Sequence, residues 1–229
     1  MSNRFIDLSA PGIPGLSPYI PGKPISELER ELGISHSIKL ASNENPLGPS
    51  VKAKAVIHGQ LDDLALYPDG GGFALSRALA KKHAVDPACI TLGNGSNDVL
   101  DMIARVFLSG DSEAIFSEYA FAVYPIVTQA VGATARVSKA IDFGHDLDAM
   151  RALITNKTRV VFIANPNNPT GTWLSSSQLL DFLNAVPPDI IVVIDEAYFE
   201  YVQEDDYPDS SKWLPQFDNL IVTRTFSKA

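Results

Sequence analysis

Two side chains of this sequence could act together on a bound ring. Lys228 follows Arg224 by four residues, and an amine held close to other cationic groups becomes a nucleophile that can form a Schiff base with a carbonyl. Asp195 follows five apolar residues, and a carboxylate buried there is costly unless a cation or a hydrogen-bond donor pairs with it. A reactive lysine and a buried acid that can pair with a pyridinium nitrogen are the pattern expected for pyridoxal phosphate. Taken singly, each has a simpler explanation: Lys228 as a solvated lysine, and Asp195 as an N-cap or part of a structural ion pair.

These residues lie in a part of the chain where apolar strands alternate with helices. Strands that are apolar throughout are covered on both faces, and their alternation with helices predicts an α/β domain with a mostly parallel sheet. A capping box of Ser175 and Gln178 marks the start of one helix. The expected strands are 89–92, 114–116, 134–137, 159–164, 190–194 and 219–223. The expected helices between them are 99–107, 124–130, 147–154 and 179–183.

Polar or small residues follow most of these strands. In an open parallel sheet, ligands gather outside the carboxyl ends of the strands, so we expect these segments to meet there. One of them is a glycine turn that would present backbone N–H groups at a helix start, where a phosphate is favoured, although a structural turn explains it equally well. It is not the dinucleotide fingerprint, because Asp98 stands in place of the third glycine. The segments are 93–97, 117–119, 165–171, 195–198 and 225–228.

The first fifty residues differ from the rest in their proline and glycine content. Seven prolines interrupt them, which disfavours continuous helix or sheet and predicts an extended arm with one short helix near 25–32. Such an arm has little to bury by itself, so we expect it to lie on a neighbouring segment or on a partner subunit. A disordered tail is the alternative.

Composition excludes several classes of protein. The chain has 229 residues and a net charge of −9, which disfavours nucleic acid and anionic membranes as partners. The single cysteine, Cys89, fits a reducing compartment, and neither a secretory signal nor a membrane span is expected, so we predict a cytoplasmic protein. The four histidines show no metal-ligand spacing, so no metal site is expected. The acidic stretch 204–209 is predicted to be a solvated loop.

Several stretches of the sequence resemble the fold-type I pyridoxal-phosphate aminotransferases. The N-P-N-N-P-T-G and S-K elements are shared by many members of that family. The N-E-N-P and Y-P-D-G elements narrow the resemblance to the histidinol-phosphate aminotransferases. The matching stretches, in a similar order and spacing, are 43–49, 67–70, 165–171, 195–198 and 225–228.

The resemblance implies a catalytic role for three residues and a cofactor contact for two more. Lys228 would hold pyridoxal phosphate covalently and then move a proton on the substrate carbon. Asp195 would keep the pyridine nitrogen protonated, and Asn168 with Tyr198 would donate hydrogen bonds to the ring oxygen. Tyr119 would stack on the ring face, although the residues before it depart from the family pattern.

The resemblance also implies where the cofactor phosphate and the substrate bind. Tyr67 would reach the phosphate from the partner subunit of a homodimer with shared active sites, and Asn43 would line the substrate entrance. The other residues implied at the phosphate are Gly95, Ser96, Asn97, Thr225 and Ser227.

The fold implied is a three-layer α/β/α large domain with a mostly parallel sheet, preceded by an N-terminal arm. Residues 1–50 would form the arm and part of a small domain, and residues 51–229 the large pyridoxal-phosphate-binding domain. Two arginines that relatives carry would fall beyond Ala229, so we expect the C-terminal part to be missing and the piece to be inactive alone.

The activity implied is amino transfer in histidine biosynthesis. L-Histidinol phosphate and 2-oxoglutarate would give imidazole acetol phosphate and L-glutamate, so the partners expected are a small amino donor and a 2-oxo acid. An aromatic amino-acid aminotransferase or a threonine-phosphate decarboxylase on the same scaffold stays open. A catalytically silent binding homologue is a further alternative, although the presence of Lys228, Asp195 and Tyr198 together disfavours it.

Overall fold

A computed structural model describes residues 6, 8–20 and 22–228 and divides the chain into two compact units. The first unit comprises the described residues up to Tyr19 together with Gly93–Ser227. The second comprises Ile20–Leu92 and Lys228. The division expected near residue 50, between an arm and a large domain, stays a prediction. No helix among the described residues is long and apolar enough to cross a membrane.

The first unit is built on a five-stranded sheet in which every strand pair is parallel. The strand order is β2-β1-β5-β6-β7, so the chain first moves outward from β1 to β2 and then continues on the other side of β1. The point where the order reverses, between β1 and β5, is where open α/β sheets bind their ligands. The strands are β1 (Glu113–Ser117), β2 (Thr134–Ser138), β5 (Thr158–Ala164), β6 (Ile191–Asp195) and β7 (Leu220–Thr223).

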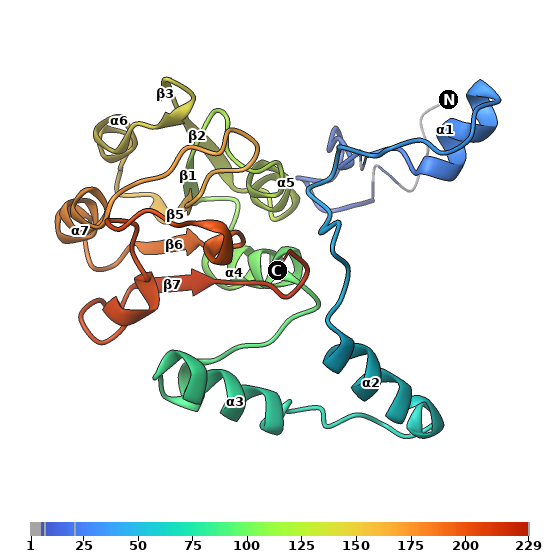
Figure 1. Ribbon diagram of the computed structural model, residues 1–229. Helices are drawn as coiled ribbons and strands as arrows, with labels where there is room; N and C mark the ends of the chain where they lie inside the picture. Colours follow the sequence, from blue (N-terminus) through green and yellow to red (C-terminus); the bar gives the residue numbers. More distant parts are fainter. Residues whose placement is uncertain (1–5, 7, 21, 229) are drawn as a thin grey trace. The chain divides into compact units, whose positions relative to one another are not determined.

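Helices cover both faces of this sheet (Figure 1). Strand β5 is apolar on both faces and therefore needs a cover on each. Val160 and Phe162 pack on one side, whereas Val161 and Ile163 pack on the other. Helices α4 (Ser96–Phe107) and α5 (Val123–Ala130) cover the first face. Helices α6 (Leu147–Ala152) and α7 (Ser176–Ala185) cover the second, where the capping box of Ser175 and Gln178 is confirmed. A short hairpin, β3 (Ala140–Ile141) and β4 (Gly144–His145), precedes α6. The predicted three-layer α/β/α fold is therefore confirmed.

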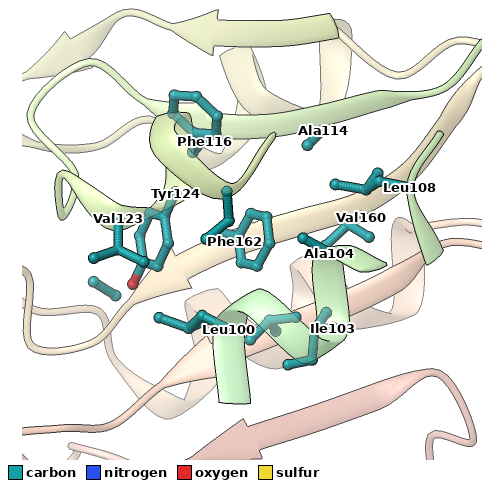
Figure 2. Close-up of a cluster of buried hydrophobic side chains, with 13 residues drawn as sticks. Leu100, Ile103, Ala104, Leu108, Ala114, Phe116, Val123, Tyr124, Val160 and Phe162 are labelled. Carbon is teal, nitrogen blue, oxygen red and sulfur yellow. The ribbon is translucent and has the colours of Figure 1, made fainter. Parts of the chain in front are cut away.

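Burial of large apolar side chains holds the layers together. Tyr124 of α5 stacks on Phe162 of β5 with ring centroids 4.9 Å apart, and both side chains are fully buried. Each buried side chain of this size contributes about 1.5–3 kcal/mol relative to the exposed state. Figure 2 shows Leu100 on the same side of this cluster as Tyr124, whereas Leu108 lies beside Ala114 at the other end. Helix α4 therefore begins near the carboxyl ends of the strands.

The second unit has helices but almost no core. Its helices are α1 (Ile25–Leu32), α2 (Val51–Gly59) and α3 (Phe73–His83), with short 3₁₀ turns at Leu61–Asp63 and Pro87–Cys89. Ala80 is the only buried residue among the described residues of 20–92. Helices this short gain most of their stability from tertiary packing, so these need a surface to pack on.

The strand predicted over 89–92 is wrong. Cys89 closes a 3₁₀ turn and is exposed, and residues 90–92 run in an irregular conformation. The β-branched and apolar residues of this segment favour a strand, but a strand needs a hydrogen-bonded neighbour, and no described segment pairs with it. The glycine turn that follows therefore precedes helix α4 without being the exit of a strand.

Part of the predicted arm packs on its own chain. Gln129 Nε2 at the end of α5 donates to the carbonyl oxygen of Gly12 at 3.3 Å. Gly12 lies so close to the Gln129 carbonyl and to Gly132 that a Cβ would not fit there. Residues 6 and 8–19 therefore belong to the first unit, and the short helix expected near 25–32 is confirmed in the second.

Candidate functional site

The loops that follow β1 and β5 are held together at the point where the strand order reverses. Asn167 Nδ2 donates to the carbonyl oxygen of Tyr119 at 3.0 Å and to Thr170 Oγ1 at 2.8 Å. Asn165 folds the same loop back on itself, because its amide bonds both backbone groups of Leu174. The asparagine-rich segment therefore builds a rigid edge, and Asn168 lies half-buried within it.

Asp195 ends β6 in a buried position and is bonded by neutral donors. Tyr124 Oη donates to Asp195 Oδ2 at 2.8 Å, and Thr223 Oγ1 donates to Asp195 Oδ1 at 2.8 Å. Burial raises the pKa of the Asp195 carboxyl, and the bonds from Thr223, Tyr124 and the Ala197 N–H offset part of that rise. Sequence reasoning missed Tyr124 and Thr223. Thr223 could have been found from the strand register, because Thr223 lies directly beside Asp195 in the parallel pair of β6 and β7.

The next residue, Glu196, is equally buried but forms an ion pair with Arg224. Arg224 donates to Glu196 Oε2 through Nε at 3.0 Å and through Nη2 at 2.6 Å, and its guanidinium lies 3.6 Å from the centre of the Phe199 ring. Asp209 accepts from Arg224 Nη2 at 2.7 Å. The prediction of a solvated loop over 204–209 is thus wrong for Asp209, because the largely buried Arg224 guanidinium pairs with that carboxylate.

The carboxylates of Asp195 and Glu196 differ in the charge of their hydrogen-bond donors. Among the residues that the structure describes, the ion pairs include Glu196 but not Asp195. A buried carboxylate with only neutral donors keeps a large desolvation cost that a cation would offset. The end of β6 is therefore suited to a positively charged N–H group of a ligand.

Asp195→Asn is expected to make the cofactor-free protein more stable at neutral pH by ~1–3 kcal/mol, because it removes a buried charge that lacks a cation. Burial raises the pKa of the carboxyl in the folded state, so the wild-type protein loses stability as the pH rises through that pKa. The amide does not titrate, so its advantage should grow from acidic to neutral pH and then level off. Urea unfolding of both proteins across this range measures the effect. An amide variant that is less stable at neutral pH would show that the carboxylate is already compensated.

The start of helix α4 offers hydrogen-bond donors at the same edge of the sheet. Gly95 precedes the helix with a φ of +82°, which side chains rarely adopt, and Ser96 and Asn97 form the first turn. The first N–H groups of a helix have no partner within it, and the helix dipole favours an anion there. Asp98 turns its carboxylate to the backbone, since its Oδ2 accepts from the Asn94 N–H at 3.0 Å.

The loop after β7 carries two hydroxyl groups. Thr225 Oγ1 and Ser227 Oγ lie 3.0 Å apart, and the Ser227 N–H donates to Thr225 Oγ1 at 3.2 Å. Lys228 follows directly and belongs by its contacts to the second unit, where its Nζ donates to the Ser42 carbonyl oxygen at 3.5 Å. Asn43 and Tyr67 also lie in the second unit, and the Tyr67 side chain is fully exposed. The roles expected for Lys228, Asn43 and Tyr67 stay predictions.

Three aromatic residues lie on the loops after β1 and β6. The Tyr119 ring is 44% exposed and lies 5.4 Å from the Phe143 ring, so its contact is with the β3–β4 hairpin. Phe121, which the sequence did not single out, packs edge-on against Tyr124 at 5.9 Å. Because Tyr124 donates a hydrogen bond to Asp195, Phe121 is connected to that carboxylate through Tyr124. Tyr198 is half-buried, three residues after Asp195.

The comparisons with known proteins agree with this arrangement. A family model described as "Aminotransferase class I and II" matches residues 35–229. The chain belongs to this aminotransferase family. Histidinol-phosphate aminotransferase 2 of Pseudomonas aeruginosa is 58% identical over 227 residues, which cover 98% of this chain and 62% of that protein. Histidinol-phosphate aminotransferase 1 of Idiomarina loihiensis is 55% identical, with 98% of this chain and 61% of that protein covered.

A solved structure shows the same fold for a family member. The histidinol-phosphate aminotransferase from Sinorhizobium meliloti, in complex with pyridoxal-5'-phosphate, superimposes with a TM-score of 0.85 at 28% identity. The alignment covers 95% of this chain and 58% of that one. This aminotransferase chain therefore spans about three fifths of the length of the relatives it matches.

Proposed function

We propose that this protein is a pyridoxal-phosphate-dependent aminotransferase that moves an amino group between L-histidinol phosphate and 2-oxoglutarate. The products are imidazole acetol phosphate and L-glutamate, in histidine biosynthesis. The observation that carries the proposal is the buried Asp195 carboxylate, which only neutral donors bond among the described residues. The names of the similar relatives supply the substrate.

The residues of the first unit fit the proposed cofactor. Asp195 fits the protonated ring nitrogen, because its anion needs a cationic N–H partner. The start of helix α4 and the hydroxyl groups of Thr225 and Ser227 fit a phosphate, which accepts hydrogen bonds from N–H and O–H donors. Gly95, Ser96 and Asn97 complete that set of donors, and Asn168 and Tyr198 fit the ring oxygen.

Lys228, Asp195 and Asn43 have the following roles in the proposed amino transfer. When bound, pyridoxal phosphate supplies a carbonyl that bonds the amino group and a protonated ring that accepts electrons from the substrate carbon. Lys228 would hold the cofactor at its carbonyl carbon and would afterwards move a proton between the substrate carbon and that same carbon. Asp195 keeps the proton on the ring nitrogen. Asn43 lines the entrance for the substrate.

A homodimer with shared active sites is part of the proposal. The second unit exposes large apolar side chains, among them Leu40, Leu47 and Tyr67, whose exposed fractions are 95%, 92% and 101%. Apolar surface on this scale supports a partner that covers it. Tyr67 of one subunit would then bind the cofactor phosphate of the other.

We place the reaction in the cytoplasm. Cys89, the single cysteine of the chain, is free and exposed, and free thiols persist in reducing compartments. The partners we propose are a small amino donor and a 2-oxo acid.

The absorbance of the cofactor tests the proposed function. Full-length protein loaded with pyridoxal phosphate should absorb visible light, lose that absorbance when histidinol phosphate is added, and regain it with 2-oxoglutarate. Aromatic amino acids and threonine phosphate serve as alternative donors. A stronger response to an aromatic amino acid, or release of CO₂ from threonine phosphate, would replace the proposed substrate. A loaded protein that is spectrally inert to every donor would favour the silent homologue.

Comparison of Tyr119→Ala with Phe121→Ala identifies the ring that stacks on the cofactor. Loss of an aromatic stacking partner is worth about 0.5–1.5 kcal/mol, so the correct variant should bind pyridoxal phosphate roughly three- to tenfold more weakly. The Tyr119 prediction requires the larger loss in Tyr119→Ala. Equilibrium binding followed by tryptophan fluorescence measures both. A larger loss in Phe121→Ala would transfer the role to Phe121.

A further inference from the structure

We propose that Tyr124 and Thr223 are positioning residues for amino transfer, which orient the Asp195 carboxylate and keep it a weaker base than a bound pyridine nitrogen. The proton shared between the carboxylate and the ring would then stay on the nitrogen. This inference rests on the proposed function and adds two residues to it that contact neither cofactor nor substrate.

The geometry gives each oxygen of the carboxylate its own donor. Tyr124 Oη reaches Oδ2 from helix α5, and Thr223 Oγ1 reaches Oδ1 from β7, each at 2.8 Å. Two donors from different elements prevent the carboxylate from rotating about its bond. The plane of the carboxylate is thereby fixed, as directional pairing with a ring nitrogen requires.

The surroundings of Tyr124 make it a rigid and permanent donor. Its ring stacks on Phe162 at 4.9 Å with an angle of 5° between the planes, and its side chain is fully buried. Burial, together with the charge of Asp195, holds the pKa of the Tyr124 phenol well above its usual range, so the hydroxyl keeps its proton. Thr223 is equally fixed, because it is buried in register beside Asp195.

Both side-chain donors to Asp195, Tyr124 and Thr223, are uncharged hydroxyl groups, and this distinguishes Asp195 from its neighbour. Glu196, one residue further on, is neutralised by Arg224 at 2.6 Å. A cation beside Asp195 would satisfy the carboxylate in the same way and would compete with a protonated ring. Hydroxyl donors instead stabilise the anion without supplying a competing charge. The carboxylate thus remains available for a cationic ligand.

Two isosteric variants test the inference in the full-length protein. Tyr124→Phe and Thr223→Val each remove one hydroxyl group and keep the packing. In the cofactor-free protein, infrared titration should show the Asp195 carboxylic acid persisting to higher pH in both variants, with the band assigned by its absence in Asp195→Asn. A hydrogen bond to a charged group is lost in each, so each variant should bind pyridoxal phosphate about tenfold more weakly. Binding of the cofactor analogue in which carbon replaces the ring nitrogen should change less than about twofold.

Thr128→Val is the matched control. Thr128 is a fully buried threonine on the same helix as Tyr124, and its hydroxyl donates to the Tyr124 carbonyl oxygen at 2.7 Å. This variant should keep the wild-type infrared titration and the wild-type preference between the two cofactors, even if it unfolds at a lower temperature.

The outcomes separate this inference from the proposed function. Wild-type protein that binds pyridoxal phosphate and the carbon analogue equally would overturn the proposed function and this inference with it. Wild-type protein that discriminates between them, with Tyr124→Phe and Thr223→Val titrating and discriminating like the wild type, would overturn this inference alone. Equal weakening for both cofactors in the variants would do the same, since it would show that the hydroxyl groups only support the fold.

Discussion

Lys228→Ala in the full-length protein is expected to stop amino transfer while pyridoxal phosphate still binds. The variant lacks the amine that we propose to hold the cofactor and to move the proton, so we expect a fall in kcat of more than about ten-thousandfold. The hydrogen-bond donors that we propose for the cofactor phosphate, at the start of helix α4 and in the loop after β7, remain, and so does Asp195. Stopped-flow measurement of cofactor absorbance during a single turnover with histidinol phosphate gives the rate.

The control for this experiment is another lysine, which lies at the amino end of the strands. Lys157 is exposed and directly precedes β5, at the amino end of the strands. Lys157→Ala should leave the rate unchanged. Turnover that persists in Lys228→Ala at a comparable rate would remove Lys228 from the proposed role, whatever the rest of the site does.

Arg224→Met is expected to destabilise the protein by about 3–5 kcal/mol, because it leaves the Glu196 carboxylate buried without a cation. Asp209 loses the same partner, and the Phe199 ring loses the guanidinium that lies 3.6 Å from its centre. Replacing Glu196 as well, in Glu196→Leu with Arg224→Met, should recover much of the loss, since the fully buried carboxylate without a cation is then removed. Urea unfolding of the two single variants and the double variant gives the coupling energy.

Arg105 provides the matched surface control. Its Nε donates to Asp101 at 2.6 Å one turn earlier in helix α4, but its side chain is 67% exposed. An exposed pair of this kind contributes only about 0.3–0.5 kcal/mol, so Arg105→Met should change the free energy of unfolding by no more than that. Equal effects of Arg105→Met and Arg224→Met would contradict the view that burial makes the Arg224 pair important.

The sequence contains enough information to predict the sheet and most of the residues at its edge. The apolar runs over 159–164, 190–194 and 219–223 are long and β-branched, and each forms a strand within one residue of its expected ends. Because parallel strands end at one edge, the positions of Asp195 and Asn168 follow from those runs alone.

The partners of these residues could not be predicted in the same way. Tyr124 lies on the apolar face of a short helix, where its pattern is that of an ordinary core residue, and only the tertiary fold brings its hydroxyl to Asp195. Asp209 stands among acidic residues, and nothing in the sequence separates it from its solvated neighbours. The segment 89–92 has strand propensity without a strand to pair with, which no local pattern reveals.

The two acids at the end of β6 have a consequence for how this protein can change in evolution. Successive side chains of a strand point to opposite faces, so Asp195 meets the layer of α5, while Glu196 meets the segment around Ser210 on the other side. An insertion or deletion of a single residue within β6 would exchange their surroundings. Asp195 would then point to the face where Glu196 now lies, and Glu196 to the face of helix α5. We therefore expect length variation among related sequences to fall in the exposed loop at 203–206 and to be absent from 191–195.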